Sequence, residues 1–175
     1  MSRSSGAHFS RALALARSGA GPRANARGSR QQGLRVFLDA NVLFSAALSA
    51  RGTAQVLLLL ADTAGADCVS SAYAWAEAHR NLAAKAPHAL HTLGLIQTVV
   101  GSVPDAMAAH VERALAARVV AKDAPVLAAA IQCGAAVFVT ADVRHFGHLF
   151  GNKVDAVLVL SLRAALDHIA GLEPP

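Results

Sequence analysis

The stretch VFLDANVLFSAAL at residues 36–48 joins a short apolar run to a helical pattern through a single aspartate. Val36, Phe37 and Leu38 predict a buried strand, because a short continuous apolar run followed by a polar residue is typical of a covered sheet. A charge that is buried without a partner costs on the order of several kcal/mol. We therefore expect Asp39 at the rim of a core, where either a helix N-terminus or a chemical function holds it.

The same alternation of apolar strands and helices continues toward the C-terminus. We expect strands at 34–39, 67–71, 98–100, 135–140 and 156–160. We expect helices from about 41, at 53–64 and 72–85, from 88, from about 104, at 123–133, as a short turn after 142, and finally to about 170. Near-continuous apolar strands separated by helices predict an α/β fold with a parallel sheet covered on both faces. A loop is expected at 151–153.

Charge divides the chain into two parts. Residues 1–32 contain six arginines and no acid, whereas the ten Lys and Arg that follow face eleven Asp and Glu. The first part is rich in Ser, Gly and Ala, which predicts a disordered basic extension. Three interpretations are open: an arm that contacts RNA or another anion, an organelle-type presequence, or upstream sequence translated from a misplaced start. We expect an inert extension, because the alanine- and arginine-rich usage suggests a GC-rich bacterial source and disfavours a presequence. The net charge of +5 therefore does not indicate a basic nucleic-acid surface on the domain expected at 33–175.

Length and hydropathy favour one domain with a sizeable core. The densest apolar run, AQVLLLLA at 54–61, is far shorter than the roughly 20 residues that span a bilayer. It predicts a buried helix, and we expect no membrane partner. Cys68 and Cys133 have neither metal-ligand nor disulfide spacing. We expect both as buried thiols in a reducing cytoplasm.

Four acids lie where such a sheet would place a site. Asp39 ends the first strand, Asp142 follows the strand AAVFVT, Asp123 opens a helix, and Glu77 lies within one. Ligands bind in the crevice beyond the carboxyl ends of parallel strands. Each acid also has a structural explanation. The aspartates can cap helices, which contributes about 1 kcal/mol, and Glu77 can pair with Arg80 for a few tenths of a kcal/mol, roughly.

Taken together, the acids favour a cation site. Two carboxylates about 4 Å apart repel by roughly 4 kcal/mol at an effective dielectric near 20, which protonation or a bound cation would relieve. Oxygen donors suit Mg²⁺ or Mn²⁺. His145 and His148 offer a rival zinc site, but no other histidine is spaced to complete three or four nitrogen or sulfur ligands. We expect these two histidines at the surface or at the lip of the site.

Four segments carry a family resemblance: VFLDANVLFSAAL, EAHRNL, KDAPVLAAAIQCGAAVFVTADVRHF and VLVLSLRAAL. In this order, over about 34–170, they resemble the PIN-domain nucleases, including the VapC-like toxins of toxin–antitoxin pairs. The resemblance implies a three-layer α/β/α sandwich with a central parallel sheet. It also implies metal-dependent hydrolysis of RNA phosphodiester bonds by a cytoplasmic enzyme, an antitoxin partner and a homodimer.

The resemblance also implies which residues act. The catalytic and metal-binding positions would be Asp39, Glu77, Asp123 and Asp142, with Asn41 and Thr140 in support. The three aspartates would bind Mg²⁺ or Mn²⁺, and Glu77 would hold the attacking water or a second ion. Asn41 and Thr140 would position ligands or the phosphate by hydrogen bonds.

One departure from the family pattern concerns Arg144. Many relatives carry a further acid two residues after the T-x-D aspartate, where this chain has Arg144. The change leaves three interpretations: a one-metal site, a weakened second metal, or loss of activity. Lys122 beside Asp123 also dilutes the negative field, although Lys122 and Arg144 equally suit a substrate phosphate.

Other functions fit the sequence less well. A haloacid-dehalogenase-type phosphatase needs a second aspartate where Asn41 stands, and a response-regulator receiver needs a phospho-acceptor that DCVSS does not offer. Ser45 and Ser70 have no evident His and Asp partners, so we expect structural roles for both. The serious alternative to a ribonuclease is a PIN-like module that has lost activity and serves in binding.

Overall fold

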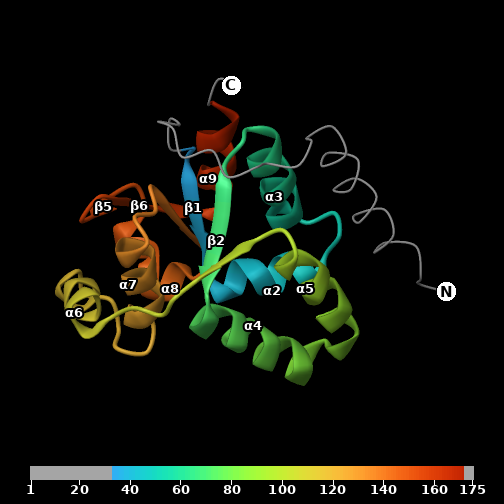
Figure 1. Cartoon of the computed structure of the whole chain (residues 1–175), viewed down its shortest axis with the longest axis horizontal. Helices are drawn as coiled ribbons and strands as arrows, with labels where there is room; N and C mark the ends of the chain where they lie inside the picture. Colours follow the sequence, from blue (N-terminus) through green and yellow to red (C-terminus); the bar gives the residue numbers. More distant parts are fainter. Residues whose placement is uncertain (1–32, 172–175) are drawn as a thin grey trace, which may run out of the picture.

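A computed structural model describes residues 33–171 and places six strands in one sheet (Figure 1). The extension expected to be disordered, at 1–32, lies outside the described residues, as do 172–175. The strands are β1 (Arg35–Leu38), β2 (Asp67–Ser71), β3 (Gly101–Val103), β4 (Val137–Thr140), β5 (Lys153–Val154) and β6 (Val157–Ser161). The α-helices are α2 (Ala40–Leu48), α3 (Thr53–Thr63), α4 (Ala72–Lys85), α5 (Leu90–Gln97), α6 (Ala108–Ala116), α7 (Ala124–Gln132), α8 (Val143–Phe146) and α9 (Leu162–Ala170). Two 3-10 turns, η1 (Pro87–Ala89) and η2 (Gly147–Leu149), precede α5 and follow α8.

The sheet has the order β3-β2-β1-β4-β6-β5. From β1 the chain continues to β2 and β3 on one side, and then crosses to β4 on the other side. β1 pairs in parallel with both β2 and β4, and Leu38 lies opposite Val139. The direction of winding therefore reverses between β1 and β4. In open α/β sheets such a reversal leaves a crevice at the carboxyl ends of the two strands, and α2, α4 and α8 gather at that end (Figure 1).

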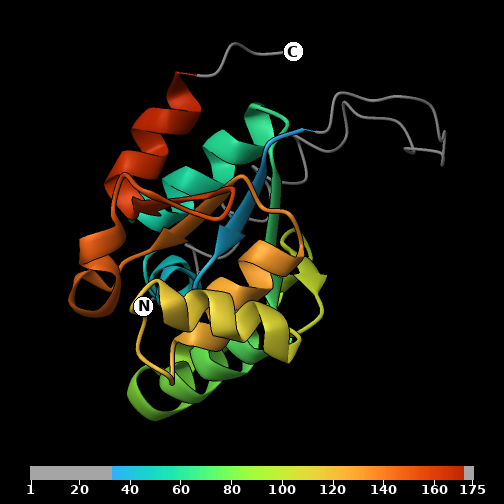
Figure 2. The same cartoon turned by 90° about the vertical axis from the view of Figure 1, so that its left-hand side faces the viewer.

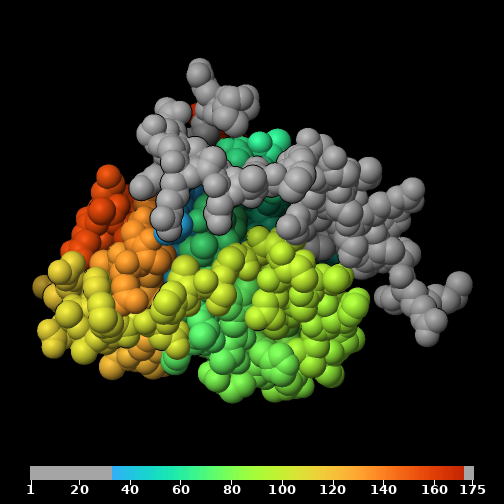
Figure 3. Space-filling view, in the orientation of Figure 1, coloured from blue at the N-terminus to red at the C-terminus, as the bar shows by residue number. Residues whose placement is uncertain are grey.

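Helices cover both faces of this sheet, as expected. α3 and α9 lie on one side of β1, and α6 and α7 lie on the other (Figure 2). Three aromatic rings pack against one another in the core between the layers. Phe138 is fully buried, and its ring centroid lies 5.9 Å from that of Phe37 and 5.2 Å from that of Phe146. α6 follows the outer edge of the molecule (yellow in Figure 3) and buries Ala114.

Two local expectations were wrong, and a third was right only in part. Residues 98–100 form the turn that ends α5, where successive amides bond back to Leu95 and Ile96, and the strand begins only at Gly101. The helix expected from 104 begins only at Ala108. The Met107 amide donates a hydrogen bond to the side chain of Gln132, which holds the segment before Ala108 as a loop. The loop expected at 151–153 is present at 151–152, but Lys153 already belongs to β5, which pairs antiparallel with β6.

Within the described part of the chain no single helix is long and apolar enough to cross a membrane; α2 and α3 together pass that test but are bent by 103°. Cys68 and Cys133 are free thiols, as expected, but both are half-buried and not fully buried. Burial raises the pKa of Cys68 to about 12, which leaves its thiol protonated and unreactive.

Candidate metal centre

Asp39 lies directly after β1, beside the end of β4. The Asp39 amide donates to the Val139 carbonyl at 3.0 Å, which extends the sheet ladder by one residue. Its side chain is almost fully buried, at 5% exposed. Oδ1 accepts from the Ala40 amide at 2.7 Å, and Oδ2 accepts from Thr140 Oγ1 at 2.6 Å and from Asn41 Nδ2 at 3.4 Å. Asn41 and Thr140, predicted as supporting residues, therefore both contact this carboxylate.

Burial dominates the ionisation of Asp39. It raises the pKa of this carboxyl to about 6, although the bonds from Thr140 and Ala40 oppose the rise. The negative charges of Glu77 and Asp123 raise the pKa further. The hydrogen bonds to Asp39 thus do not fully compensate its burial, and two other predicted acids act on it electrostatically.

Asp142 is linked to Asp39 through one hydroxyl. The Asp142 amide donates to Thr140 Oγ1 at 3.0 Å, while the same hydroxyl donates to Asp39. Asp142 caps α8, because its Oδ1 accepts from the His145 amide at 3.0 Å. Burial would raise the pKa of Asp142, but hydrogen bonds from the His145 ring and amide outweigh burial and hold that pKa below its usual value.

Asp123 differs from the other two aspartates. It precedes α7 but makes no side-chain capping bond, so the helix-cap explanation is wrong for this residue. Its Oδ2 atom is buried and has no hydrogen-bond partner among residues 33–171. Burial raises the pKa of Asp123, against the positive charges of Lys122 and His145. A buried carboxylate oxygen that has ion-pair contacts but no hydrogen bond is costly and suits a cation ligand.

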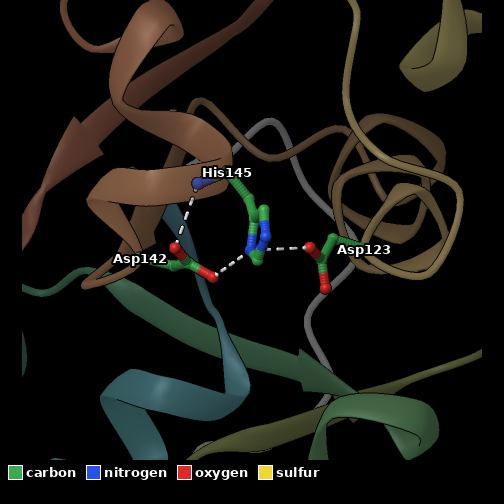
Figure 4. A group of neighbouring side chains, drawn as sticks. All are labelled: Asp123, Asp142 and His145. Carbon is green, nitrogen blue, oxygen red and sulfur yellow. Dashed lines mark hydrogen bonds and ion pairs between the residues drawn. The ribbon is translucent and has the colours of Figure 1, made fainter.

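His145 joins the two carboxylates (Figure 4). Its Nδ1 lies 2.7 Å from Asp142 Oδ2 and 3.2 Å from Asp123 Oδ2. With a side chain only 18% exposed, His145 lies within the site, and the expectation of a surface or lip histidine was wrong. His148 instead contacts the Ala117 carbonyl. The spacing of three residues between Asp142 and His145 could have predicted this contact. In the first turn of α8 that spacing brings the His145 ring back to Asp142, the N-cap of the helix.

Glu77 lies half-buried on α4. Within the described residues it forms no ion pair with Arg80, so that structural explanation is wrong. Its charge acts on Asp39. However, neither Glu77 nor Asp39 belongs to the group whose ligand atoms all lie within 4.8 Å of one another, which consists of Asp123, Asp142 and His145.

Tyr73 ties α4 to the loop that carries Asp123. Its hydroxyl donates to the Lys122 carbonyl at 3.1 Å, and its amide donates to Asp105 Oδ1 at 2.8 Å. Nothing in the sequence pattern singled out this residue. It fixes the separation between the Glu77 helix and the Asp123 loop.

The remaining residues considered in the sequence are two serines and two basic residues. Ser45 and Ser70 donate to the carbonyls of Asn41 and Leu38, so their structural roles are confirmed. Lys122 is 67% exposed, with Nζ 3.9 Å from Asp123 Oδ2. Arg144 is exposed and forms no ion pair within 33–171. The residue that turns into the site is its neighbour, His145.

The donor set fits a divalent cation. Asp123 and Asp142 offer carboxylate oxygens from opposite sides of His145, and the Asp123 oxygen has no hydrogen bond among residues 33–171. Asp39 adds a buried negative charge that is linked to Asp142 through the Thr140 hydroxyl. Hard cations take carboxylate oxygens in such sites, so the residues present are compatible with Mg²⁺ or Mn²⁺.

Replacing Thr140 with valine tests the link between Asp39 and Asp142. The change removes the donor to Asp39 and the acceptor of the Asp142 amide. We expect a loss of about 1–2 kcal/mol in the free energy of unfolding, because buried polar groups lose partners. Urea denaturation at pH 7 measures it. Thr63→Val is the control, because it removes an exposed hydrogen bond within α3; we expect it to lower the free energy of unfolding by under about 0.5 kcal/mol. Equal losses for the two variants would contradict the link between Asp39 and Asp142.

Comparison with known proteins supports the fold. No protein-family model and no curated protein sequence matches this chain. Among solved structures, VapBC2 from Rickettsia felis bound to a DNA fragment from their promoter is similar, with a TM-score of 0.56 and 14% identity. The match covers 73% of this chain and 98% of that chain. At this identity the likeness concerns fold alone, and the expected PIN-like α/β/α sandwich is confirmed at that level.

Proposed function

We propose that this chain is a divalent-metal-dependent endoribonuclease and the toxin of a type II toxin–antitoxin pair. The observation that carries the proposal is the meeting of Asp123 and Asp142 at the switch point of a PIN-like sheet, beside the buried Asp39. The similar fold of the VapBC2 structure supports it. On this proposal residues 33–175 form the nuclease domain.

Each acid has a separate task in this mechanism. Asp123 and Asp142 would hold Mg²⁺ or Mn²⁺, which polarises the scissile phosphate and lowers the pKa of a water for in-line attack. Asp39, held by Thr140 and Asn41, contributes a fixed negative charge or a further ligand. Glu77, on the neighbouring helix, orients the attacking water and accepts its proton.

The substrate phosphate needs positive groups at the rim. Lys122 and Arg144 are both exposed and flank the site in sequence, next to Asp123 and Asp142 respectively. Both are suited to contact an RNA phosphate, since Arg144 forms no ion pair in the described part of the chain and the contact of Lys122 with Asp123, at 3.9 Å, is long. Contacts of this kind position the backbone without reading its sequence.

Replacing Lys122 with methionine separates its two effects. We expect Mn²⁺ affinity to rise by at most about fivefold, because an exposed pair contributes up to about 1 kcal/mol. RNA binding should weaken, and the slope of log K against log salt should fall by about 0.7 for a single-stranded substrate. Calorimetry and salt-dependent RNA binding measure the two effects. An unchanged salt slope would contradict the phosphate contact.

The partners follow from the same proposal. An antitoxin would cover the acidic crevice, with a basic side chain directed at Asp123 and Asp142. The free enzyme would act on RNA in the cytoplasm, as a homodimer. Co-purification with the product of an adjacent small open reading frame tests the antitoxin, and sedimentation tests the dimer.

A catalytically inactive PIN-like binding module is the alternative, and the exposed Arg144 favours it. Cleavage of a labelled structured RNA with Mn²⁺, Mg²⁺ or EDTA distinguishes the two. Metal-dependent cutting supports the nuclease. RNA binding by folded protein without cutting under any metal supports the inactive module.

A further inference from the structure

We infer that His145 is a metal ligand, and that with Asp123 and Asp142 it makes a mixed nitrogen–oxygen site that prefers a first-row transition-metal ion to Mg²⁺. The inference rests on the proposed function, because it concerns the same centre. It changes the expected cofactor from an oxygen-bound hard ion to one that takes an imidazole.

The spacing of the donor atoms supports this assignment. His145 Nδ1 lies 2.7 Å from one carboxylate oxygen and 3.2 Å from the other. Metal–ligand distances of about 2.1 Å place two ligands at right angles roughly 3 Å apart. These two separations are in the range of neighbouring ligands of one ion, which would take the place of the Nδ1 proton that bonds to Asp142.

The imidazole is also held in place before any ion arrives. Its backbone amide bonds to Asp142 Oδ1 at 3.0 Å. The next residue, Phe146, is buried against Phe138 and anchors α8 to the core. Figure 4 shows the ring between the two carboxylates. Preorganised donors avoid the entropic cost of ordering a ligand on binding.

The second observation is that Asp123 Oδ2 lacks a hydrogen bond and is contacted by charged groups alone, His145 and, at 3.9 Å, Lys122. Asp123 Oδ2 is buried, faces His145 at 3.2 Å and has no hydrogen bond in the described part of the chain. A hydrogen bond from the ring to Asp142 alone would leave this oxygen unsatisfied. One cation bound to all three residues satisfies both carboxylates at once.

Donor chemistry determines which ion is preferred. Imidazole nitrogen suits Zn²⁺, Ni²⁺, Cu²⁺ and iron, and affinity at mixed sites rises from Mn²⁺ through Co²⁺ toward Cu²⁺. Mg²⁺ prefers oxygen, keeps several waters and gains little from imidazole. His145 should therefore strengthen the binding of transition metals much more than that of Mg²⁺.

Co²⁺ titration of the full chain tests the inference, since its visible absorption reports the ligands. With His145→Gln we expect at least about tenfold weaker Co²⁺ binding, and a Mg²⁺ affinity within about threefold of the wild type. His148→Gln is the matched control, because His148 lies outside the group of Asp123, Asp142 and His145 and its ring contacts the Ala117 carbonyl; it should bind Co²⁺ like the wild type. Equal Co²⁺ binding by the wild type and His145→Gln would overturn the inference.

Two further readouts keep the outcome decisive. If His145→Gln fails to fold, pulsed electron paramagnetic resonance of one equivalent of Mn²⁺ on the wild type and on His148→Gln detects a bound imidazole nitrogen directly; its absence overturns the inference. Mg²⁺-supported RNA cleavage by His145→Gln separates the two claims. If His145→Gln cleaves RNA and binds Co²⁺ as the wild type does, the proposed nuclease is supported and the histidine ligand is rejected. If the wild type binds metal through a nitrogen but cleaves no RNA, the metal site is supported and the proposed nuclease is rejected.

Discussion

Replacing Asp142 with asparagine is expected to lower metal-dependent RNA cleavage by at least about 100-fold. Loss of a residue that merely supports a metal ligand costs 10–100-fold in affinity or activity, roughly, and a direct ligand should cost more. The fold should persist, because asparagine is as good an N-cap as aspartate and its oxygen can accept from the His145 amide as Asp142 does.

The comparison for this variant is Asp62→Asn. Asp62 is an exposed carboxylate near the end of α3, so its neutralisation should leave cleavage within about twofold. Single-turnover cleavage of labelled RNA at saturating Mn²⁺ measures both variants. Full activity in Asp142→Asn would remove this residue from the metal centre.

Replacing Asp39 with asparagine should stabilise the metal-free protein and inactivate it at the same time. The pKa of Asp39 is about 6 in the folded chain, against 3.8 ordinarily. Between these values the folded state binds more protons than the unfolded state, so stability falls as pH rises. Above pH 6 the full cost is present, about 3 kcal/mol. Asparagine carries no charge, so we expect a gain of about 1–3 kcal/mol at pH 8, which shrinks toward pH 4.

Urea denaturation in EDTA at pH 4.5 and pH 8 checks this prediction. The wild type should lose stability relative to Asp39→Asn as pH rises, and bound metal should reverse the order because it stabilises only the wild-type site. Cleavage should fall by at least about 100-fold, as for a lost ligand. A variant that is less stable than the wild type at both pH values would show that Asp39 is retained for structure.

The elements of the fold were largely predictable from local pattern. β2 and α4 have the expected bounds, since DCVSS and the following breaker-free run are unambiguous. β3 was misplaced because local bonds to Leu95 and Ile96 continue the end of α5 through 98–100. α6 was misplaced because Gln132 of α7 fixes the backbone of Met107, and that tertiary contact has no local signature. The antiparallel β5 is two residues long, too short for periodicity to detect.

The candidate site was predicted in part. The strand-end rule brought Asp39 and Asp142 to one edge, joined by the Thr140 hydroxyl. It did not predict that the ligand atoms of Asp123 and Asp142 would lie close together while those of Asp39 lie outside this group. Side-chain direction decides that, and Asp39 is turned onto Ala40 and Thr140. His145 was expected at the surface or lip of the site, but the short helix α8 brings its ring back to its N-cap, Asp142.

The central claim is metal-dependent cleavage of RNA, and one measurement tests it most directly. Purified full-length protein, free of any antitoxin, is mixed with an end-labelled structured RNA in Mn²⁺, in Mg²⁺ and in EDTA, beside Asp142→Asn. We expect discrete fragments with the wild type and metal, and none in EDTA or with the variant. Intact RNA under every metal, from protein whose circular dichroism shows it folded, would contradict the account.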